Sequence, residues 1–398
     1  MQENLILASN SFIWLSNDTG LIYNTDTAGV YEFPLSASIR KLCDHFLNYD
    51  NMYSIVVDRD ISDCDVREFI DNIMVNKLGF VTDVGQQFIS LPPILNILND
   101  YDRIKNSQGR DGYERVLKYL SSITLYIGGD IKWNQTYYKQ TAYPIASEHK
   151  ADVHKFLQFL KRARSKYLSK LNIVLSSIND LELIIPITDL STQSAIPTNI
   201  YIHCHDIYKA ALKEVLTVSD VISVVLIMES NIPEAAIREI VQTYQNGVGY
   251  NFLIKSEQDY SLFSCLISDY GVASYNLIPI YDDNFDFFEK NIFLTKEEII
   301  AIKPSKREVF INQTLNSNFF GYLHLFPDGK VYANVNCKPI GALDDSVYDI
   351  IVNELEQNTA WRVTRGQLSG RCGKCLYRYF CPPISNYELI TAKMDHCK

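Results

Sequence analysis

The sequence lacks both a long hydrophobic run and a surplus of basic residues. Its longest apolar stretch, residues 221–228, is interrupted by Ser223, whereas a membrane-spanning helix needs roughly 20 apolar residues. The first ten residues contain neither a basic segment nor an extended apolar one, so they do not resemble a secretory signal. We therefore expect a cytoplasmic protein that does not associate with a membrane.

An excess of positive charge and several catalytic sequence motifs are also missing. Lys and Arg number 37 and Asp and Glu number 47, which gives a formal net charge of −10. Because non-specific nucleic-acid binding depends on clustered cations, this balance disfavours a nucleic-acid partner. Gly247-x-Gly249 lacks the third glycine of a dinucleotide-binding fingerprint, and no Walker A or G-x-S-x-G sequence occurs.

What is present is a folded chain of several parts. Apolar residues make up 47% and charged residues 21% of the 398 positions, which predicts two to four globular domains at about 100–200 residues each. Residues 1–85 are expected to form a small module. Its strand-like runs at 11–16, 21–24 and 30–33 are followed by two amphipathic helices and a closing strand at 80–82, an order that is typical of a winged-helix module.

Residues 86–118 look like a linker, and residues 119–315 alternate between strand and helix. Strands are expected at 123–127, 181–185, 199–203, 223–228, 248–254 and 273–278, and helices at 149–171, 234–245 and 257–270. Such alternation implies right-handed crossovers and a parallel sheet. About six units are countable, which favours an incomplete α/β barrel, with an open doubly wound sheet as the alternative.

Residues 316–398 carry a hairpin signal around Pro327-Asp328-Gly329, a helix at 345–358 and a cysteine-rich tail. Four of the nine cysteines lie in the last 27 residues with the spacing C-x2-C-x5-C-x15-C. Gly373 is expected to ease the first turn because it tolerates a positive φ. Since a reduced compartment keeps thiols unpaired, clustered cysteines there are metal ligands more often than disulfides. The four are Cys372, Cys375, Cys381 and Cys397.

Three interpretations of this cluster compete. A zinc site usually pairs one C-x2-C with a second C-x2-C or with two histidines. Here the last two cysteines are widely and unevenly spaced, which weighs against zinc, although His396 beside Cys397 leaves a zinc site as an alternative. A [4Fe–4S] cluster needs four thiolates and accepts irregular spacing. Four unliganded cysteines are the third possibility. The spacing favours iron–sulfur over zinc, and either of these over no metal.

The C-x2-C-x5-C pattern with a later lone cysteine resembles the SPASM/twitch extension of radical-SAM peptide-modifying enzymes. This resemblance implies that the four tail cysteines ligate one auxiliary [4Fe–4S] cluster. Ser385 stands where the family has a further cysteine, and Asn334 stands where it has a hairpin cysteine after Gly329. A second cluster is therefore not expected. Cys337, three residues out of register, is the alternative fourth ligand.

Radical-SAM enzymes also carry C-x3-C-x2-C directly after the first barrel strand, and residues 123–135 of this chain contain no cysteine. Three thiolates in one loop are the minimum for the catalytic cluster, so neither SAM as a cofactor nor its reductive cleavage is expected. Gly128-Gly129-Asp130 is similar to the family's Gly-Gly-Glu, although a strand-ending turn is the favoured interpretation. This combination of features resembles the pseudo-radical-SAM proteins found beside GG-type peptide precursors in Bacteroidales.

The N-terminal module resembles the PqqD-like peptide-recognition element of such systems. The resemblance implies that a leader peptide is added as a strand beside the third predicted strand, against a facing helix. The module is acidic, and Arg40-Lys41 is the only basic pair in its first helix, which disfavours DNA binding. The implied peptide-binding residues are Val30, Tyr31, Glu32, Phe33, Arg67, Ile70 and Met74.

We therefore expect a degenerate, non-catalytic radical-SAM-like protein that assists the maturation of a ribosomally synthesised peptide beside a radical-SAM partner enzyme. The alternatives are an active enzyme with an unrecognised barrel cofactor and a zinc-stabilised regulatory or DNA-binding protein. His203-Cys204-His205 ends a predicted strand, and alternation puts both histidines on one face. The two imidazoles could ligate a metal or flank a pocket, but no third partner is visible, so a polar pair at a strand end is favoured.

Overall fold

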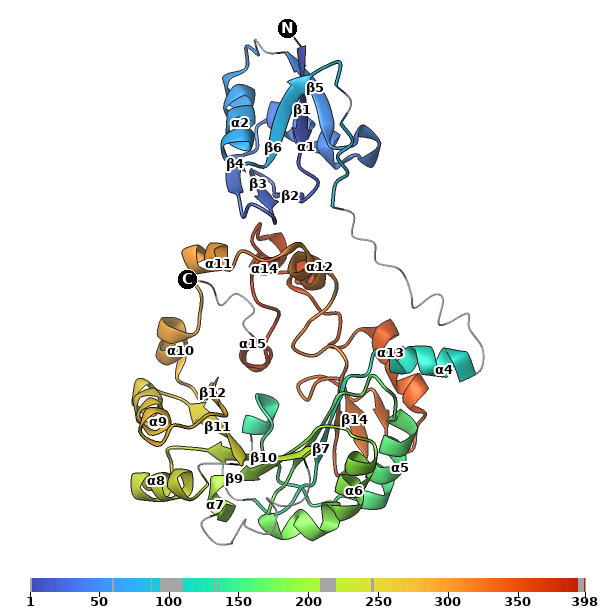
Figure 1. Cartoon of the computed structure of the whole chain (residues 1–398), viewed down its shortest axis with the longest axis vertical. Helices are drawn as coiled ribbons and strands as arrows, with labels where there is room; N and C mark the ends of the chain where they lie inside the picture. The colour runs from blue at the N-terminus through green and yellow to red at the C-terminus, as the bar shows by residue number, and fades with distance from the viewer. Residues whose placement is uncertain are drawn as a thin grey trace.

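The computed structural model describes residues 2–58, 61–86, 88–93, 110–131, 134, 136–207, 220–244, 247–392 and 397. Figure 1 shows a small N-terminal module that stands above a larger α/β body, with C-terminal helices between the two. Within the described residues, every helix is either too short or too polar to cross a bilayer.

Two three-stranded antiparallel sheets, β5-β1-β6 and β2-β3-β4, form the N-terminal module together with two helices. Strands β1 and β5 were not predicted, and they pair with each other in the middle and at one edge of the first sheet. The module core includes Leu5, Phe33, Phe46 and Phe69. The elements are β1 (Gln2–Leu7), β2 (Ser11–Leu15), β3 (Thr19–Asn24), β4 (Val30–Pro34), α1 (Ala37–Leu47), η1 (Tyr49–Asn51), β5 (Ser54–Asp58), α2 (Cys64–Val75) and β6 (Gly79–Asp83).

The α/β body contains a nine-stranded, mostly parallel sheet, which confirms the predicted α/β class. Six parallel strands follow one another in sequence order, and a seventh, β13, pairs in parallel with β7 at the opposite end before the antiparallel β14 and β15. A doubly wound sheet reverses its strand order, and this run does not. The strands are β7 (Ser122–Tyr126), β8 (Lys170–Val174), β9 (Thr198–His203), β10 (Ile222–Met228), β11 (Val248–Ile254), β12 (Tyr275–Pro279), β13 (Tyr322–Leu325), β14 (Lys330–Tyr332) and β15 (Gly341–Ala342).

Right-handed crossovers between neighbouring strands place their helices on one face of a sheet, and Figure 1 shows α5, α6, α8 and α9 on the outer side. The remaining helical elements complete the chain. They are α4 (Arg110–Leu117), η2 (Tyr137–Lys139), α5 (Val153–Ala163), η3 (Ile178–Ile184), α6 (Ile185–Gln193), α7 (Cys204–Ile207), α8 (Glu234–Thr243), α9 (Glu257–Tyr270), α10 (Phe285–Asn291), α11 (Lys296–Ala301), α12 (Lys306–Thr314), α13 (Val347–Gln357), η5 (Arg365–Gln367), α14 (Arg371–Lys374) and α15 (Asn386–Thr391).

Two predicted elements of this body are wrong. The strand expected at 181–185 is helical, because Ser177 and Asp180 form a capping box that starts η3 and Pro186 occupies the first turn of α6, a position that proline favours. The helix expected at 149–171 ends at Ala163, and its last residues belong instead to β8.

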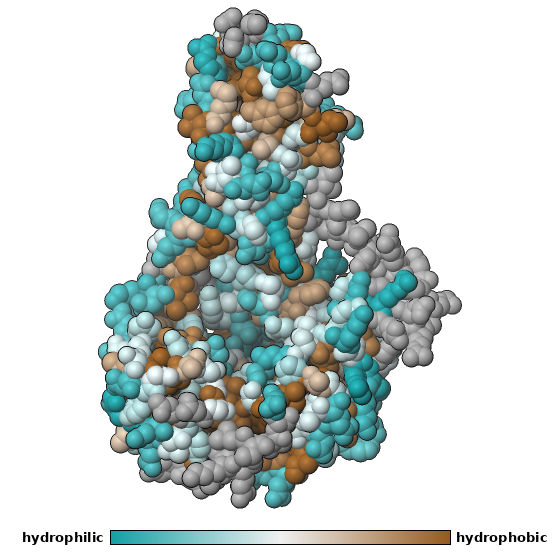
Figure 2. All heavy atoms as spheres, in the orientation of Figure 1, coloured by the Kyte–Doolittle hydropathy of each residue, from teal (hydrophilic) through white to brown (hydrophobic). Residues whose placement is uncertain are grey.

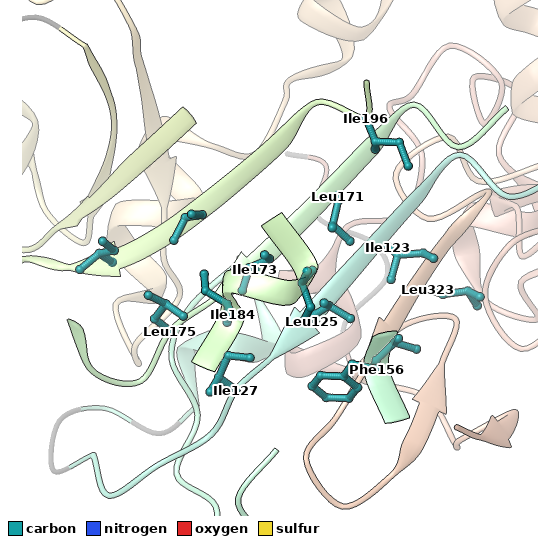
Figure 3. Close-up of a cluster of buried hydrophobic side chains, with 14 of the residues drawn as sticks. Ile123, Leu125, Ile127, Phe156, Leu171, Ile173, Leu175, Ile184, Ile196 and Leu323 are labelled. Atoms are coloured by element: carbon teal, nitrogen blue, oxygen red, sulfur yellow. The ribbon is translucent and has the colours of Figure 1, made fainter. Parts of the chain in front are cut away.

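The core of the body lies between the sheet and its outer helices. Alternate residues along each strand point to this side, as Figure 3 shows for Ile123, Leu125 and Ile127 of β7 and its extension, beside Phe156 of α5. The opposite face carries a second buried cluster that includes Tyr126. The sheet is therefore covered on both faces near the carboxyl ends of its strands.

The module packs onto the C-terminal region through the outer face of β2-β3-β4. Trp14 and Tyr23 contact the ring of Phe380 with centroids 6.0 and 4.6 Å apart, and the Tyr23 hydroxyl donates to the Pro304 carbonyl at 2.7 Å. These residues belong to one buried cluster with Leu376. Figure 2 shows that the molecule narrows between the module and the body.

Candidate functional site

The fold brings the four tail cysteines to one cavity. Cys372 lies in α14, Cys375 caps that helix, and the Cys381 amide donates to the carbonyl of Tyr377. Cys397 pairs with Leu294 in an isolated β-bridge, which carries the last cysteine back to the others. The cavity has a volume of about 220 Å³, and all four cysteines line it.

The spacing of the sulfurs bears on which metal could bind. Within the described part of the chain, no three of these cysteine sulfurs lie within 4.8 Å of one another. Sulfurs that share one tetrahedral zinc ion lie about 4 Å apart, given a Zn–S distance of about 2.3 Å. A [4Fe–4S] cluster separates its thiolates more widely because each binds a different iron atom. The four thiols therefore surround a cavity rather than converge on one point.

A buried arginine adjoins the cavity. Arg365 makes a two-pronged ion pair with Glu388, with distances of 2.8 and 3.1 Å, and also donates to the Pro382 carbonyl at 2.7 Å. Burial raises the pKa of Cys381 to about 12 and that of Cys372 above its usual value, and the charge of Arg365 opposes both increases. A bound metal would supply the remaining positive charge that the thiolates need.

Gly373 is required for a different reason from the one predicted. It lies within the helical turn of α14 and is absent from the glycines with positive φ. A Cβ at this position would lie 1.9 Å from the carbonyl oxygen of Leu368. Close approach of the backbone, rather than a left-handed turn, excludes a side chain here.

Cys337 lies outside this group. Its thiol donates to the Thr359 carbonyl at 3.4 Å, and the residue packs against the core of the α/β body. Burial raises its pKa to about 11. Cys337 does not line the cavity that the other four cysteines share.

Strand β4 forms one edge of its sheet. The Leu35 amide donates to Asp18 and the Asn24 amide donates to Gly29, and together with the register this fixes which β4 residues face β3. Because the direction of backbone groups alternates along a strand, Tyr31 and Phe33 bond to β3, whereas the backbone groups of Val30 and Glu32 point outward. This edge can therefore accept an added strand.

Two elements flank the β4 edge. On the module side, Phe69 of α2 contacts the rings of Tyr31 and Phe33 at 6.0 and 4.9 Å. On the other side, Glu32 accepts hydrogen bonds from Lys296 at 2.6 Å and from the Tyr377 hydroxyl at 2.7 Å. Tyr377 lies between Cys375 and Cys381 in the sequence, so the edge strand contacts the cysteine loop directly.

The other predicted peptide-binding residues of α2 lie elsewhere on the helix. Arg67 is exposed and its guanidinium donates to the Ile61 carbonyl. Ile70 is part of the module core, and Met74 is exposed. Phe69, which contacts β4, was not predicted as a site residue.

The carboxyl edge of the sheet is closed by the loop that follows β7. Gly128 has a φ of 70° and ends the strand, as the turn interpretation predicted. Further along the loop, Tyr137 and Tyr143 are buried, and the Tyr137 hydroxyl donates to Asp282 beyond β12 at 2.6 Å. Gln140 exchanges two hydrogen bonds of 2.8 Å with the backbone of Tyr281. Aromatic and amide side chains thus occupy the loop that follows β7.

A buried polar network lies beneath this loop. Glu229 accepts a hydrogen bond from the Tyr143 hydroxyl at 2.6 Å, lies 2.9 Å from Nε2 of His203 and 3.9 Å from Nζ of Lys255. Burial alone would raise the pKa of Glu229, but His203 and Tyr143 lower it. Burial alone would lower the pKa of His203, but hydrogen bonds with Cys204 and Glu229 raise it to about 9.

The network was missed in the sequence because its members are far apart along the chain. One signal was available. Glu229 directly follows β10 and Lys255 directly follows β11, and residues at the carboxyl ends of parallel strands converge on one edge of the sheet. Tyr143 carries no comparable signal, since it lies within a loop.

No model of a protein family matches the sequence, and no curated protein matches it. Among solved structures, Streptococcus suis SuiB bound to its precursor peptide SuiA is similar at 10% identity over 99% of this chain and 98% of that one, with a TM-score of 0.47. SuiB bound to S-adenosylmethionine is similar at 12% identity over 100% and 98%, with a TM-score of 0.43. Native anSMEcpe with bound AdoMet is similar at 12% identity over 65% and 87%, with a TM-score of 0.40. A likeness at this level carries no argument about function.

Proposed function

We propose that this chain is a radical-SAM-like protein that assists the maturation of a ribosomally synthesised peptide without cleaving SAM itself. It binds a leader peptide at the β4 edge and holds one [4Fe–4S] cluster at Cys372, Cys375, Cys381 and Cys397, and it acts beside a radical-SAM partner enzyme. The observation that carries the proposal is the convergence of these four cysteines on one cavity.

The domain division follows the same proposal. Six parallel strands in sequence order with helices on one face support a partial (β/α) barrel across residues 119–315. Residues 1–85 form the winged-helix-like peptide-recognition module, residues 86–118 link it to the barrel, and residues 316–398 form the SPASM/twitch-like domain. Most of the linker lies outside the described residues, and α4 occupies its last part.

The four cysteines would hold the cluster, and the cluster would supply either a rigid cross-link between chain segments or a site for electron transfer. The chain's own part is to bring Cys397 beside the others through the bridge to Leu294 and to keep Arg365 near the thiolates. Tyr377 and Glu32 join the cysteine loop to β4. A peptide added to the β4 edge would therefore lie next to the cluster domain.

The cluster is tested by anaerobic reconstitution of the full chain with iron and sulfide. We expect about four iron atoms per chain and the visible absorption band of an iron–sulfur cluster. Replacing Cys381 with Ser should remove most of the iron, whereas Cys337→Ser, the matched control, should keep it. Purified protein that holds one zinc ion and takes up no iron would contradict this part of the proposal.

Peptide binding is tested with the fluorescently labelled leader segment of a short Gly-Gly peptide encoded beside this chain. Val30→Pro removes an outward N–H from the β4 edge, a position where proline is tolerated in edge strands. We expect at least a tenfold loss of affinity by fluorescence anisotropy. Val56 of β5 also directs its backbone outward from a sheet edge, so Val56→Pro is the matched control. Equal losses in both variants, or no binding to the native chain, would refute β4 as the peptide site.

A further inference from the structure

A strand-to-helix transition gathers three consecutive side chains at the carboxyl end of β9. His203 is the last residue of the strand, and α7 begins at Cys204. In a continued strand the Cys204 side chain would point to the face opposite the histidines. Here the helical turn brings its sulfur to 4.0 Å from Nδ1 of His203, and the His203 and His205 rings stack with centroids 5.0 Å apart.

The donor atoms of these three residues are close enough to share one ion. One ligand atom from each of His203, Cys204 and His205 lies within 4.8 Å of those of the other two. Nitrogen and sulfur ligands of a tetrahedral zinc ion lie about 3.5 Å apart, given bond lengths of about 2.0 and 2.3 Å. Small side-chain rotations would therefore suffice to complete the contacts. The third partner that the sequence did not reveal is the cysteine between the two histidines.

The second nitrogen of His203 is held in the way that metal-binding histidines usually are. Its Nε2 lies 2.9 Å from Glu229 Oε1, whereas Nδ1 lies 4.0 Å from the Cys204 sulfur and accepts a hydrogen bond from the His205 amide at 3.3 Å, which a metal ion would replace. Glu229 is oriented in turn by the Tyr143 hydroxyl at 2.6 Å and by the Asn231 amide at 3.2 Å. A carboxylate on the outer nitrogen of a ligating histidine fixes the ring and strengthens its metal bond.

Burial favours the same assignment. His203, Cys204 and Glu229 are each at most 1% exposed, and His205 is half-buried. Buried polar and charged groups need partners that offset the loss of water, and one ion would bind the sulfur and a nitrogen of each ring at once. A thiolate with two imidazoles suits zinc and leaves a fourth position for water or another ligand.

We infer that His203, Cys204 and His205 form a second metal site, for one zinc ion, with Glu229 orienting His203 from behind. The site lies at the carboxyl edge of the parallel sheet and shares no residue with the cysteine cavity. The inference of this zinc site does not depend on whether the tail cysteines hold an iron–sulfur cluster.

Cobalt(II) is the probe, because a thiolate bound to tetrahedral Co²⁺ gives visible and near-ultraviolet absorption bands. The full-length chain is titrated with Co²⁺ and then with Zn²⁺ under anaerobic conditions, and the native spectrum is compared with that of each variant. The difference spectrum isolates this site from any cobalt bound by the tail cysteines. We expect Cys204→Ala to remove one thiolate–cobalt contribution and one zinc equivalent.

Further variants separate ligation from packing. His205→Asn changes a half-buried residue, so it should leave the fold intact and still lower zinc affinity at least tenfold. Glu229→Gln should lower affinity by about 10- to 100-fold while the thiolate–cobalt bands remain, as expected for a residue that acts through His203. Cys265→Ser on α9, which replaces an exposed cysteine, is the matched control and should change nothing. Identical cobalt spectra and zinc equivalents in the native chain, Cys204→Ala and His205→Asn would overturn the assignment.

Discussion

At the scale of single residues, the cysteine cavity depends on positions that hold no metal themselves. Gly373 is the clearest, because a methyl group there would collide with the Leu368 carbonyl. We expect Gly373→Ala to displace Cys372 and Cys375 and to reduce iron uptake severalfold, measured as iron per chain after reconstitution. Gly370, three residues earlier, has open space around its Cβ position. Gly370→Ala should keep the native iron content, and an equal loss in both variants would contradict this account.

Arg365 is a second such position. Replacing it with Met would leave Glu388 buried without its partner, and breaking a buried ion pair from one side costs about 3–5 kcal/mol. Arg238 and Glu234 form an exposed pair on α8, for which the loss should be about 0.5 kcal/mol. Urea unfolding of cluster-free Arg365→Met and Arg238→Met measures the two effects. Similar urea midpoints of unfolding for the two variants would show that the Arg365–Glu388 pair stabilises the fold no more than the exposed pair does.

At the scale of elements, β4 is tied to the C-terminal region by a carboxylate. Burial alone would raise the pKa of Glu32, but hydrogen bonds from Lys296 and Tyr377 lower it below its ordinary 4.5. A lowered pKa in the folded state means that the ion pair stabilises the protein above about pH 4.5 and that this contribution disappears as the pH falls through the folded value. Glu32 is partly exposed, so the contribution is about 0.5–1 kcal/mol.

Glu32→Gln should therefore lower the free energy of unfolding by about that amount at pH 7. The difference in the free energy of unfolding between native chain and variant should shrink toward zero as the pH falls through the lowered pKa of Glu32, since protonated Glu32 resembles glutamine in charge. Urea unfolding of both proteins across this range is the measurement. A difference that is equally large at neutral and acidic pH would show that the ion pair is not its origin.

The secondary-structure elements differ in how far local sequence patterns predicted them. The stripes of α1 and α2 and the alternation of the parallel strands are local, so the module helices and the α/β class were predicted correctly. β8 was missed because its first two residues, Lys170 and Leu171, were assigned to the end of the predicted helix at 149–171. Among the site residues, the Cys372–Cys375 spacing is visible in one turn. Cys397 approaches Leu294 from about 100 residues away along the chain, and Tyr143 approaches Glu229 across 86 residues. No local pattern reports such contacts.

At the scale of the whole molecule, the aromatic cluster around Phe380 joins the N-terminal module to the C-terminal cysteine region. Phe380 is 1% exposed and contacts Trp14, Tyr23 and Tyr377. Truncating a buried phenylalanine to alanine costs about 3–5 kcal/mol. Because this cluster is separate from the main core of the sheet, we expect Phe380→Ala to loosen the interface rather than the whole chain.

Hydrogen exchange of backbone amides distinguishes the two outcomes. Phe380→Ala should speed exchange in β2, β3 and α12 and leave β9 and β10 protected, whereas Phe156→Ala, a truncation of similar size in the main core, should affect β7 and β8 first. Because the aromatic cluster helps to hold the module against the C-terminal region, Phe380→Ala should also weaken leader-peptide binding, since the elements that flank the β4 edge would separate. Uniformly faster exchange throughout the chain would mean instead that the module and the body unfold as one unit.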